Sequence, residues 1–401
     1  MAVPAENPVI PSSEEHKPPR EPLARKTSEL IYSYTATKRF RDATTNDTEK
    51  PSSSSSPSHH TLSLDFDDSG EFLLTSRSDS TLQIYSATSG KHTNTLFSQK
   101  YGCHLARFTH TPTTCIYAST KNDHAIRHLS THDNAYINYF AGHTGQVTDI
   151  ALSPRSDAFV SCGEDNTVRY WDLHTPHARF QLQMETPYLC AYDPTGFVVA
   201  IASPSTSSII LYDSRYLDQI PFHAFDLAPI EAQHIPHDNT HLNWSGLEFA
   251  NDGKSILLST TGTGHYLLDA FDGELKGFLS RPNYPHPAKA SLSATRRNPP
   301  GYVSDTSRPL GQTDACFTSD GRFVVSSTGS EDPNSGLAIY DTDPSVLTTP
   351  NQLIMPTHVL AGHGQAGRVD LVACNPRWHL IATAERDVVF WGADEETARR
   401  E

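Results

Sequence analysis

Apolar and polar side chains alternate in short runs along most of the chain, and polar turns separate the runs. From Val147 to Leu173 the sequence reads VTDIALS, then the turn PRSD, then AFVSCG, then the turn EDN, then TVRYWDL. Alternation with a period of two is typical of half-buried β-strands, and such short turns are typical of antiparallel connections. We therefore predict three antiparallel strands within this stretch.

The same arrangement occurs seven times, and each copy can be marked by the residue before its first turn. These residues are Phe66, Phe108, Leu152, Tyr192, Phe249, Phe317 and Cys374. The first three steps between them, of 42, 44 and 40 residues, agree with the repeat length of a propeller blade. The last three steps, of 57, 68 and 57 residues, contain additional loop sequence.

Seven copies predict an all-β fold, a seven-bladed β-propeller. One sheet of three or four strands buries little apolar surface, whereas stacked sheets cover each other's faces, and a closed ring exposes no sheet edge. We expect the propeller to span residues 61–392. The segment 28–41, with the strand-like sequence ELIYSYTATKRF from Glu29 to Phe40, is expected to close the last blade. The alternative for this segment is a nuclear import signal in its basic motif KRFR.

The remaining segments are polar and are expected to lie outside the ring. Residues 1–27 are rich in Pro, Glu, Ser and Lys and are predicted to be disordered, and residues 42–60 form a flexible Ser-rich linker. Residues 393–401 form a polar tail. A disordered Arg/Pro-rich insertion is expected over 281–310. Its basic residues are Arg281, Lys289, Arg296, Arg297 and Arg308. Either it contacts an acidic or phosphorylated peptide or it is merely solvated.

Composition narrows the classes of function. The formal net charge of −15 opposes binding to a phosphate backbone, so we expect no sequence-specific contact with nucleic acid. No apolar run approaches the roughly 18 residues that a membrane-spanning helix requires, and the N-terminus has no apolar signal segment. The six cysteines are scattered without a C-x-x-C pair, which predicts reduced thiols and no zinc site. We expect no metal and no cofactor.

The repeat that begins at Gly142 contains the three residue types of a hydrolase triad. His143 precedes the first strand, Ser161 lies on the second and Asp165 lies in the turn that follows. We expect Asp165 to orient His143, which then reaches Ser161 and the indole N–H of Trp171 on the third strand. A nucleophilic serine needs an open cleft with oxyanion donors, whereas buried polar groups need partners of this kind. The set is therefore interpreted as a structural network, and the protein as a non-enzyme.

This repeat resembles the WD40 family in its Gly-His pair, its serine and aspartate, and its final Trp171-Asp172. Within that family, residues 29–281 and 311–392 are similar to the WD-repeat subunits of COMPASS histone H3 lysine-4 methyltransferase complexes. The stretch THDNAYINYFAGHTGQV, which begins at Thr131, carries part of this similarity. The N-terminal tail, the serine linker and the Arg-rich insertion depart from it.

The resemblance implies a nuclear, non-catalytic adaptor that binds a SET-domain methyltransferase and other COMPASS subunits and supports recruitment to transcribed chromatin. Members of this family are also linked to the phosphorylated tail of RNA polymerase II. In yeast-type fungi they are shared with the cleavage and polyadenylation factor, and animal relatives join a protein phosphatase complex. Two rival hypotheses stay open: an enzyme hidden in the ring, and a WD40 substrate receptor of another complex such as a ubiquitin ligase.

Candidate partner contacts lie in the best-matching loops and in the basic insertion. They are His132, Asp133, Tyr136, Tyr139, Arg296 and Arg297. For the two tyrosines, a packing role is the alternative.

Overall fold

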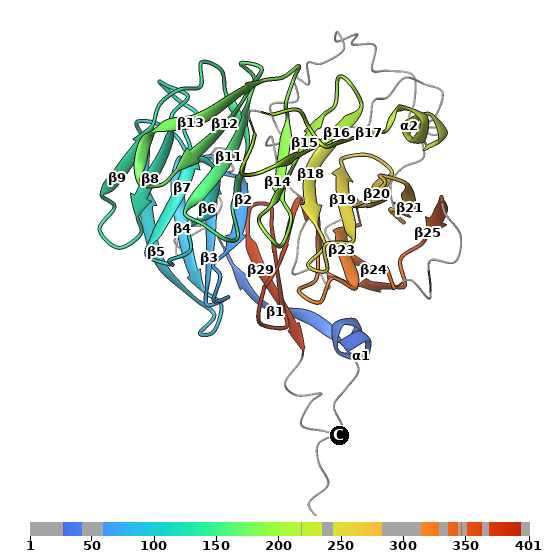
Figure 1. Ribbon diagram of the computed structural model, residues 1–401. Coiled ribbons are helices and arrows are strands. Elements are labelled where there is room, and N and C mark those ends of the chain that lie inside the picture. The colour runs from blue at the N-terminus through green and yellow to red at the C-terminus, as the bar shows by residue number, and fades with distance from the viewer. Residues whose placement is uncertain are drawn as a thin grey trace, which may run out of the picture.

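The protein is a ring of seven β-sheets, and the prediction of a seven-bladed β-propeller is confirmed (Figure 1). The computed structural model describes residues 27–41, 59–217, 219–234, 244–282, 314–328, 336–343, 346, 351–362 and 369–393. The innermost strands of neighbouring blades contact one another around the whole ring, and the first blade contacts the last. Within the described residues, no helix is long and apolar enough to cross a membrane.

Blades 1 to 4 each contain four antiparallel strands that follow one another along the chain from the centre outward. The strands are β2 (Thr61–Phe66), β3 (Phe72–Arg77), β4 (Thr81–Ser86) and β5 (Lys91–Phe97) in blade 1; β6 (His104–Phe108), β7 (Thr114–Ala118), β8 (Ile126–Ser130) and β9 (Tyr136–Phe140) in blade 2; β10 (Val147–Leu152), β11 (Ala158–Gly163), β12 (Thr167–Asp172) and β13 (Thr175–Gln183) in blade 3; and β14 (Leu189–Tyr192), β15 (Val198–Ser203), β16 (Ser208–Asp213) and β17 (His223–Asp226) in blade 4.

Blades 5 to 7 depart from this simple order. Their strands are β18 (Trp244–Phe249), β19 (Ser255–Thr260), β20 (Gly264–Asp269), β21 (Leu275–Ser280) and β25 (Gln352–Ile354) in blade 5; β22 (Ala315–Phe317), β23 (Phe323–Ser327), β24 (Leu337–Asp341) and β26 (His358–Leu360) in blade 6; and β27 (Leu371–Cys374), β28 (Leu380–Ala384), β29 (Val388–Ala393) and β1 (Tyr34–Phe40) in blade 7. The helices are α1 (Thr27–Tyr32) and α2 (Ala228–His234).

Each of the seven marker residues is the last residue of an innermost strand, from Phe66 in β2 to Cys374 in β27. This agreement follows from local chemistry, because the apolar run ends where a turn rich in Asp, Asn, Pro or Gly begins. The middle strands, such as β11 and β15, are buried over all or all but one of their residues, and their apolar side chains pack between neighbouring blades.

The N-terminal segment closes the ring, as predicted. β1 pairs antiparallel with β29 from Tyr34 opposite Ala393 to Phe40 opposite Val388, so it is the outer strand of blade 7. The two strands lie side by side in Figure 1. The expected strand over Glu29–Phe40 was wrong at its start, because the pairing with β29 begins at Tyr34. Residues there form α1 instead, and its Ile31 is buried between blades 6 and 7.

Two elements lie in segments that were interpreted as inserted loop. α2 follows β17, and its Glu231 accepts a hydrogen bond from the Trp244 indole at 2.9 Å. β25 pairs in parallel with β21 and adds a fifth strand to blade 5, although it lies in the connection between β24 and β26 of blade 6.

The start of the predicted disordered insertion was also placed wrongly. Arg281 is buried, with 2% of its side chain exposed, and it forms an ion pair with Asp314. Its backbone N–H donates to the Thr263 carbonyl, so it continues the hairpin of blade 5. The rest of the insertion from residue 283 lies outside the described residues, as do residues 1–26, 42–58 and 394–401.

Candidate functional site

The structure brings together the four residues of the expected network in blade 3. The Nδ1 atom of His143 lies 3.1 Å from Asp165 Oδ1, and its Nε2 atom lies 2.7 Å from Ser161 Oγ. The Trp171 indole N–H donates to the same Ser161 oxygen at 2.8 Å. Gly163 makes room for this contact, because a Cβ atom there would lie 2.6 Å from His143 Nδ1.

One assignment of protons satisfies every member of this network. If His143 Nδ1–H donates to Asp165, the Ser161 hydroxyl donates to Nε2 and accepts from Trp171, so the imidazole is neutral. Burial, which outweighs the attraction of Asp165, lowers the pKa of His143 and favours that neutral form. Ser161 and Trp171 are fully buried, so the hydroxyl faces no cleft in which a substrate could bind.

Replacement of Ser161 with alanine is expected to lower the free energy of unfolding by about 1–3 kcal/mol, because the Trp171 N–H and the His143 ring each lose a buried partner. Urea unfolding measures the change. Ser89→Ala, at an exposed turn serine, is the matched control and should change stability by less than about 0.5 kcal/mol. Labelling of the wild-type Ser161 by a serine-hydrolase probe, or unchanged stability of Ser161→Ala, would contradict the structural interpretation.

Other blades contain different polar contacts in place of this network. In blade 7 the Trp391 indole donates to Thr383 Oγ1 at 2.9 Å. In blade 5 His265 is fully buried, accepts from the Thr260 N–H and lies 2.7 Å from Ser326 Oγ of blade 6. Burial, with a further contribution from the nearby guanidinium of Arg281, lowers the pKa of His265 to about 3. The sequence interpretation missed this site because its members lie far apart in the chain.

The predicted partner-contact residues of blade 2 lie on its outer hairpin. Tyr139 of β9 is exposed and packs against Tyr136, with ring centroids 5.4 Å apart. The guanidinium of Arg127 in β8 lies 3.6 Å from the centre of the Tyr101 ring and 5.7 Å from that of Tyr139. A bidentate ion pair with Asp123 holds that guanidinium in place, so the aromatic rings are supported by a fixed cation.

His132 and Asp133 are exposed in the turn between β8 and β9. A hydrogen bond from Ser130 holds the pKa of Asp133 below its ordinary value. The structure thus places four of the six predicted contact residues on one hairpin. Arg296 and Arg297 lie outside the described residues.

A cavity of about 360 Å³ lies at one mouth of the central channel and is lined by the innermost strands of blades 1 to 5. Five acidic residues line it together with one cation, Arg107. Three of them, Asp65, Asp149 and Glu248, lie on innermost strands. Each of these three carboxylates accepts a backbone N–H from the innermost strand of the next blade: Asp65 from Phe108 at 2.8 Å, Asp149 from Cys190 at 3.0 Å, and Glu248 from Phe317 at 3.1 Å.

These hydrogen bonds connect successive blades, but they are made by carboxyl groups that are partly removed from water. Burial raises the pKa of Asp65 and Asp149 to about 6 and that of Glu248 to about 7, against the attraction of Arg107. Raised pKa values mean that the folded protein holds protons which the unfolded chain releases. Between about pH 4 and pH 7, the contribution of these three carboxyl groups to stability therefore falls as the pH rises.

Glu248→Gln is expected to weaken this pH dependence, because the amide keeps an acceptor for the Phe317 N–H and cannot ionise. Relative to wild type, the variant should gain up to about 3 kcal/mol between pH 5 and pH 8. Urea titrations at both pH values measure the difference. Glu274→Gln, at an exposed carboxyl, serves as control, and an equal gain there or no gain at Glu248 would contradict the assignment.

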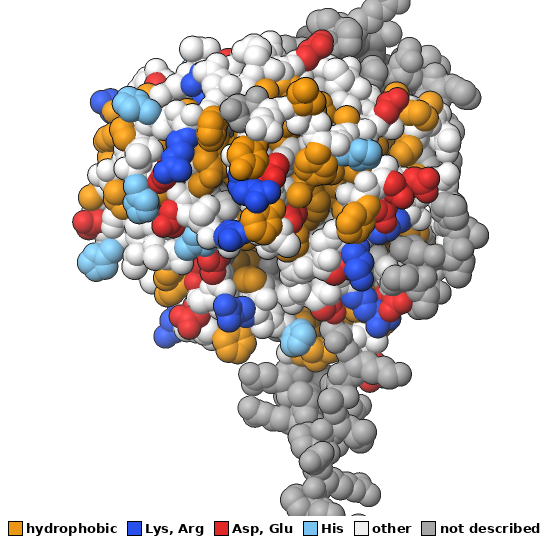
Figure 2. All heavy atoms as spheres, in the orientation of Figure 1, with side chains coloured by type: hydrophobic (Ala, Val, Ile, Leu, Met, Phe, Trp, Pro, Cys, Tyr) orange, Lys and Arg blue, Asp and Glu red, His pale blue; other side chains and the backbone are white. Residues whose placement is uncertain are grey.

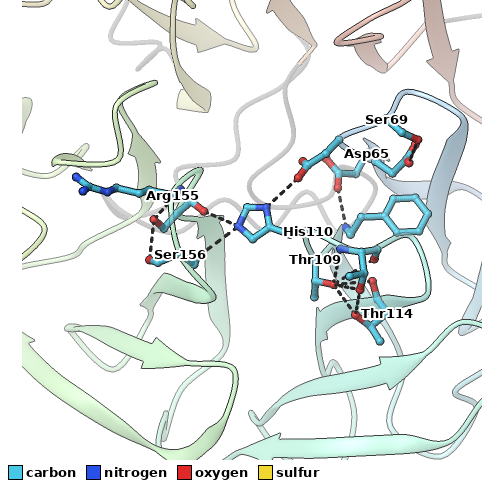
Figure 3. Close-up of polar contacts among 12 residues, drawn as sticks. Asp65, Ser69, Thr109, His110, Thr114, Arg155 and Ser156 are labelled. Carbon is cyan, nitrogen blue, oxygen red and sulfur yellow. Dashed lines mark hydrogen bonds and ion pairs between the residues drawn. The ribbon is translucent and has the colours of Figure 1, made fainter.

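His110 joins three blades on the same side of the ring (Figure 3). From the turn after β6, its Nδ1 lies 2.8 Å from Asp68 Oδ2 of blade 1, and its Nε2 lies 2.9 Å from the Ser153 carbonyl of blade 3. Burial alone would lower the pKa of His110, but the Asp68 carboxylate outweighs it and the pKa is raised. Both ring nitrogens face acceptors, so the protonated ring fits this position.

An exposed ladder of aromatic and basic side chains borders the channel mouth at blades 3 and 4. The guanidinium of Arg155 lies 4.3 Å from the centre of the Phe197 ring, and that of Arg215 lies 5.1 Å from it and 5.6 Å from Tyr216. Figure 2 shows hydrophobic side chains interspersed with basic ones over the region where Figure 1 places β14, β15 and β18. Sequence analysis missed this ladder, because its members come from three separate turns.

Within the described residues, no group of three or more His, Cys, Asp or Glu side chains is placed to hold a metal ion. The described residues instead provide buried polar contacts between blades and exposed aromatic side chains on blades 2 and 4.

The closed ring of seven sheets and the network of blade 3 define the class as WD-repeat β-propellers. The sequence profile described as "WD domain, G-beta repeat" matches residues 52–86 and 134–172. The "COMPASS component SWD2" of Saccharomyces cerevisiae is 34% identical over 333 residues, which cover 83% of this chain and 91% of the yeast protein.

Two further relatives show the same extent of similarity. The "Set1 complex component swd2" of Schizosaccharomyces pombe is 33% identical over 82% of this chain and 91% of its own length. The "WD repeat-containing protein 82" of Drosophila melanogaster is 34% identical over 82% of this chain and 89% of its own length. The chain belongs to the family of WD-repeat proteins that contains these relatives.

Proposed function

We propose that this protein is a non-catalytic scaffold subunit of a nuclear Set1/COMPASS-type histone H3 lysine-4 methyltransferase complex. The proposal is carried by the similarity to the COMPASS component SWD2, which extends over 91% of that protein rather than over a few repeats. In this role the protein binds the SET-domain methyltransferase and helps bring it to transcribed chromatin. A further role in mRNA 3′-end processing, and contact with the phosphorylated RNA polymerase II tail or a phosphatase, belong to the same proposal.

The physical character of the ring supports a scaffold. Ser161, His143 and Asp165 make their hydrogen bonds to one another inside blade 3 and hold its turn in place. Inter-blade contacts through Asp65, Asp149 and Glu248 stiffen the ring, and a stiff disc presents loops and rim strands in fixed positions for partner segments.

We assign the partner contact to the outer hairpin of blade 2. Tyr139 is 47% exposed and Ile137, next to it on β9, is 53% exposed, which is unusual for large apolar side chains on a strand. Arg127 and Asp123 hold the neighbouring rings in place, so little side-chain entropy is lost on binding. An extended segment of the methyltransferase pairs along β9 and covers these side chains.

Affinity purification of the tagged full-length chain from nuclear extract tests the proposed function. Recovery of a SET-domain methyltransferase with its COMPASS subunits is the expected result. Recovery of a cullin scaffold instead would favour the runner-up, a ubiquitin-ligase substrate receptor. That alternative rests on 26% identity to the human "DDB1- and CUL4-associated factor 6" over 52% of this chain. Substrate turnover by the isolated chain would overturn the scaffold role.

Variants of the hairpin test the assigned contact. Tyr139→Ala, and separately His132→Ala with Asp133→Ala, should each reduce recovery of the methyltransferase by at least about tenfold if a contact of roughly 1.4 kcal/mol or more is lost. Phe271→Ala, at a 75% exposed aromatic side chain of blade 5, is the matched control. Melting curves verify that each variant is folded, and equal recovery by all of them would remove the hairpin from the proposal.

A further inference from the structure

Two cysteine thiols meet at the seam between blades 6 and 7. Cys316 lies in β22 and Cys374 ends β27, so the two residues belong to innermost strands of neighbouring blades. Their sulfur atoms are 3.3 Å apart, and the Cys316 S–H donates toward Cys374 Sγ. The two cysteines are 58 positions apart in the chain, and the segment between them includes β23, β24, β25 and β26. A disulfide bond is about 2.05 Å long, so the two sulfurs must approach by a little over about 1 Å to form one.

Cys374 is the more exposed of the two residues. A cavity of about 90 Å³ opens beside Cys374, and it is lined by Tyr34, Asp320 and Trp378 among others. Cys374 is half-buried, whereas Cys316 is 6% exposed and sits against the apolar side chains of the seam. The cavity holds a few molecules of the size of water, so a small oxidant reaches Cys374 while a folded protein or a bulky peptide does not.

We propose that Cys316 and Cys374 form a peroxide-sensitive thiol pair, in which Cys374 is oxidised first and Cys316 resolves it to a disulfide that joins blades 6 and 7.

In the first step the Cys374 thiolate attacks one oxygen of hydrogen peroxide. The S–O bond forms, the O–O bond breaks, and the leaving hydroxide takes up a proton as water. In the second step the Cys316 sulfur attacks the Cys374 sulfur. The S–S bond forms, the S–O bond breaks, and the hydroxide leaves with the thiol proton as a second water.

Burial and the hydrogen bond between the two sulfurs make Cys316 the less reactive of the two thiols. The contact with Cys374, followed by burial, raises the pKa of the Cys316 thiol. Cys316 therefore stays protonated and unreactive until a sulfenic acid forms next to it. The disulfide would lie beside Tyr34 of β1 and would join blade 6 to blade 7, the blade that closes the ring.

The other cysteines of the protein serve as controls for selective oxidation of Cys316 and Cys374. The other four cysteines, Cys103, Cys115, Cys162 and Cys190, are at most 3% exposed. Cys162 and Cys190 are the closest match, because their thiols interact across blades 3 and 4. If access through the cavity beside Cys374 determines the reaction, the matched pair stays reduced under conditions that oxidise the seam pair.

The test treats the folded full-length protein with hydrogen peroxide, blocks free thiols, digests without reductant and maps the peptides by mass spectrometry. We expect a Cys316–Cys374 cross-link with the loss of two hydrogen atoms, reversed by dithiothreitol, and a melting temperature raised by several degrees because the cross-link closes a loop of 58 residues. Absence of this cross-link, or equal cross-linking of Cys162 with Cys190, overturns the proposal.

Single variants separate the two roles. Cys374→Ser should abolish both the cross-link and sulfenic acid labelling by dimedone. Cys316→Ser should leave Cys374 as a dimedone-labelled sulfenic acid, because its resolving thiol is gone. If the melting temperature of Cys316→Ser is well below that of the wild type, Cys316→Ala is used in its place, because alanine keeps an apolar side chain in the seam. Dimedone labelling of Cys316 in the Cys374→Ser protein would show that the exposed thiol is not the first to react and would contradict the mechanism.

Discussion

Removal of residues 1–41 is expected to unfold most of the protein at 25 °C. The deletion takes β1 from blade 7 and leaves β29 as an open edge. It also removes the buried side chains of Ile31 and Tyr34, and the Phe40 ring that packs 4.7 Å from Tyr85 of blade 1. Each such side chain contributes roughly 1.5–3 kcal/mol, so the total loss is on the order of 5–10 kcal/mol with the strand hydrogen bonds, which is comparable to the stability of a typical domain.

The matched control deletes residues 1–26 only and keeps α1 and β1. Circular dichroism melting and size-exclusion chromatography compare the two proteins. We expect the shorter deletion to melt within about 2 °C of the full chain, and the longer one to lose its cooperative transition and aggregate through its open edge. Adding the peptide of residues 27–41 should partly restore the transition, because it binds the folded state alone. A cooperative melt of the longer deletion at the wild-type temperature would show that three strands suffice for blade 7.

The ring was predictable because its determinants are local. Each innermost strand ends at a turn that can be read from the sequence, as at Leu152 before SPRSD, and the buried middle strands are mostly apolar. The outer strands carry a weaker pattern. β13 exposes every second residue and begins with three exposed ones, and β26 has only three residues, so neither differs clearly from a polar loop.

What could not be predicted depends on pairing across the chain. β25 lies in the long connection between β24 and β26, yet it pairs in parallel with β21 of blade 5, and no local signal in the sequence identifies that partner. The channel carboxylates, such as Asp65 and Glu248, look like ordinary polar positions of a half-buried strand until the ring places them around one cavity. The blade 3 network was predictable by contrast, because its four members lie within 29 consecutive residues, from His143 to Trp171.

Arg281 is the clearest case of a residue whose role depends on a partner far away in the chain. In sequence it begins a run of basic residues in a Pro-rich segment, which is typical of a solvated loop. In the fold its carboxylate partner, Asp314, is supplied from 33 residues further along the chain, at the start of blade 6. The guanidinium also donates to the Thr260 carbonyl at 3.0 Å and reaches His265 at 3.2 Å. Arg281 is therefore a buried cation that connects blades 5 and 6, although its position in the sequence is typical of a solvated loop.

Asp314→Ala is therefore expected to lower the free energy of unfolding by about 3–5 kcal/mol, because it leaves the Arg281 charge buried without a counter-charge. Asp213→Ala is the matched control, since its partner Arg215 is 59% exposed and water replaces the lost contact at a cost below about 1 kcal/mol. Urea unfolding at pH 7 compares the variants.

The double variant Arg281→Met with Asp314→Ala separates a missing counter-charge from a simple loss of packing. If the unpaired charge dominates, removal of both groups should recover at least half of the stability that Asp314→Ala loses, since no ion then remains in the seam. If packing and the contacts to Thr260 and His265 dominate, the double variant should be less stable than the single one. Because blades 5 and 6 meet at this pair, the second outcome would mean that Arg281 supports the seam mainly through its hydrogen bonds rather than through its charge.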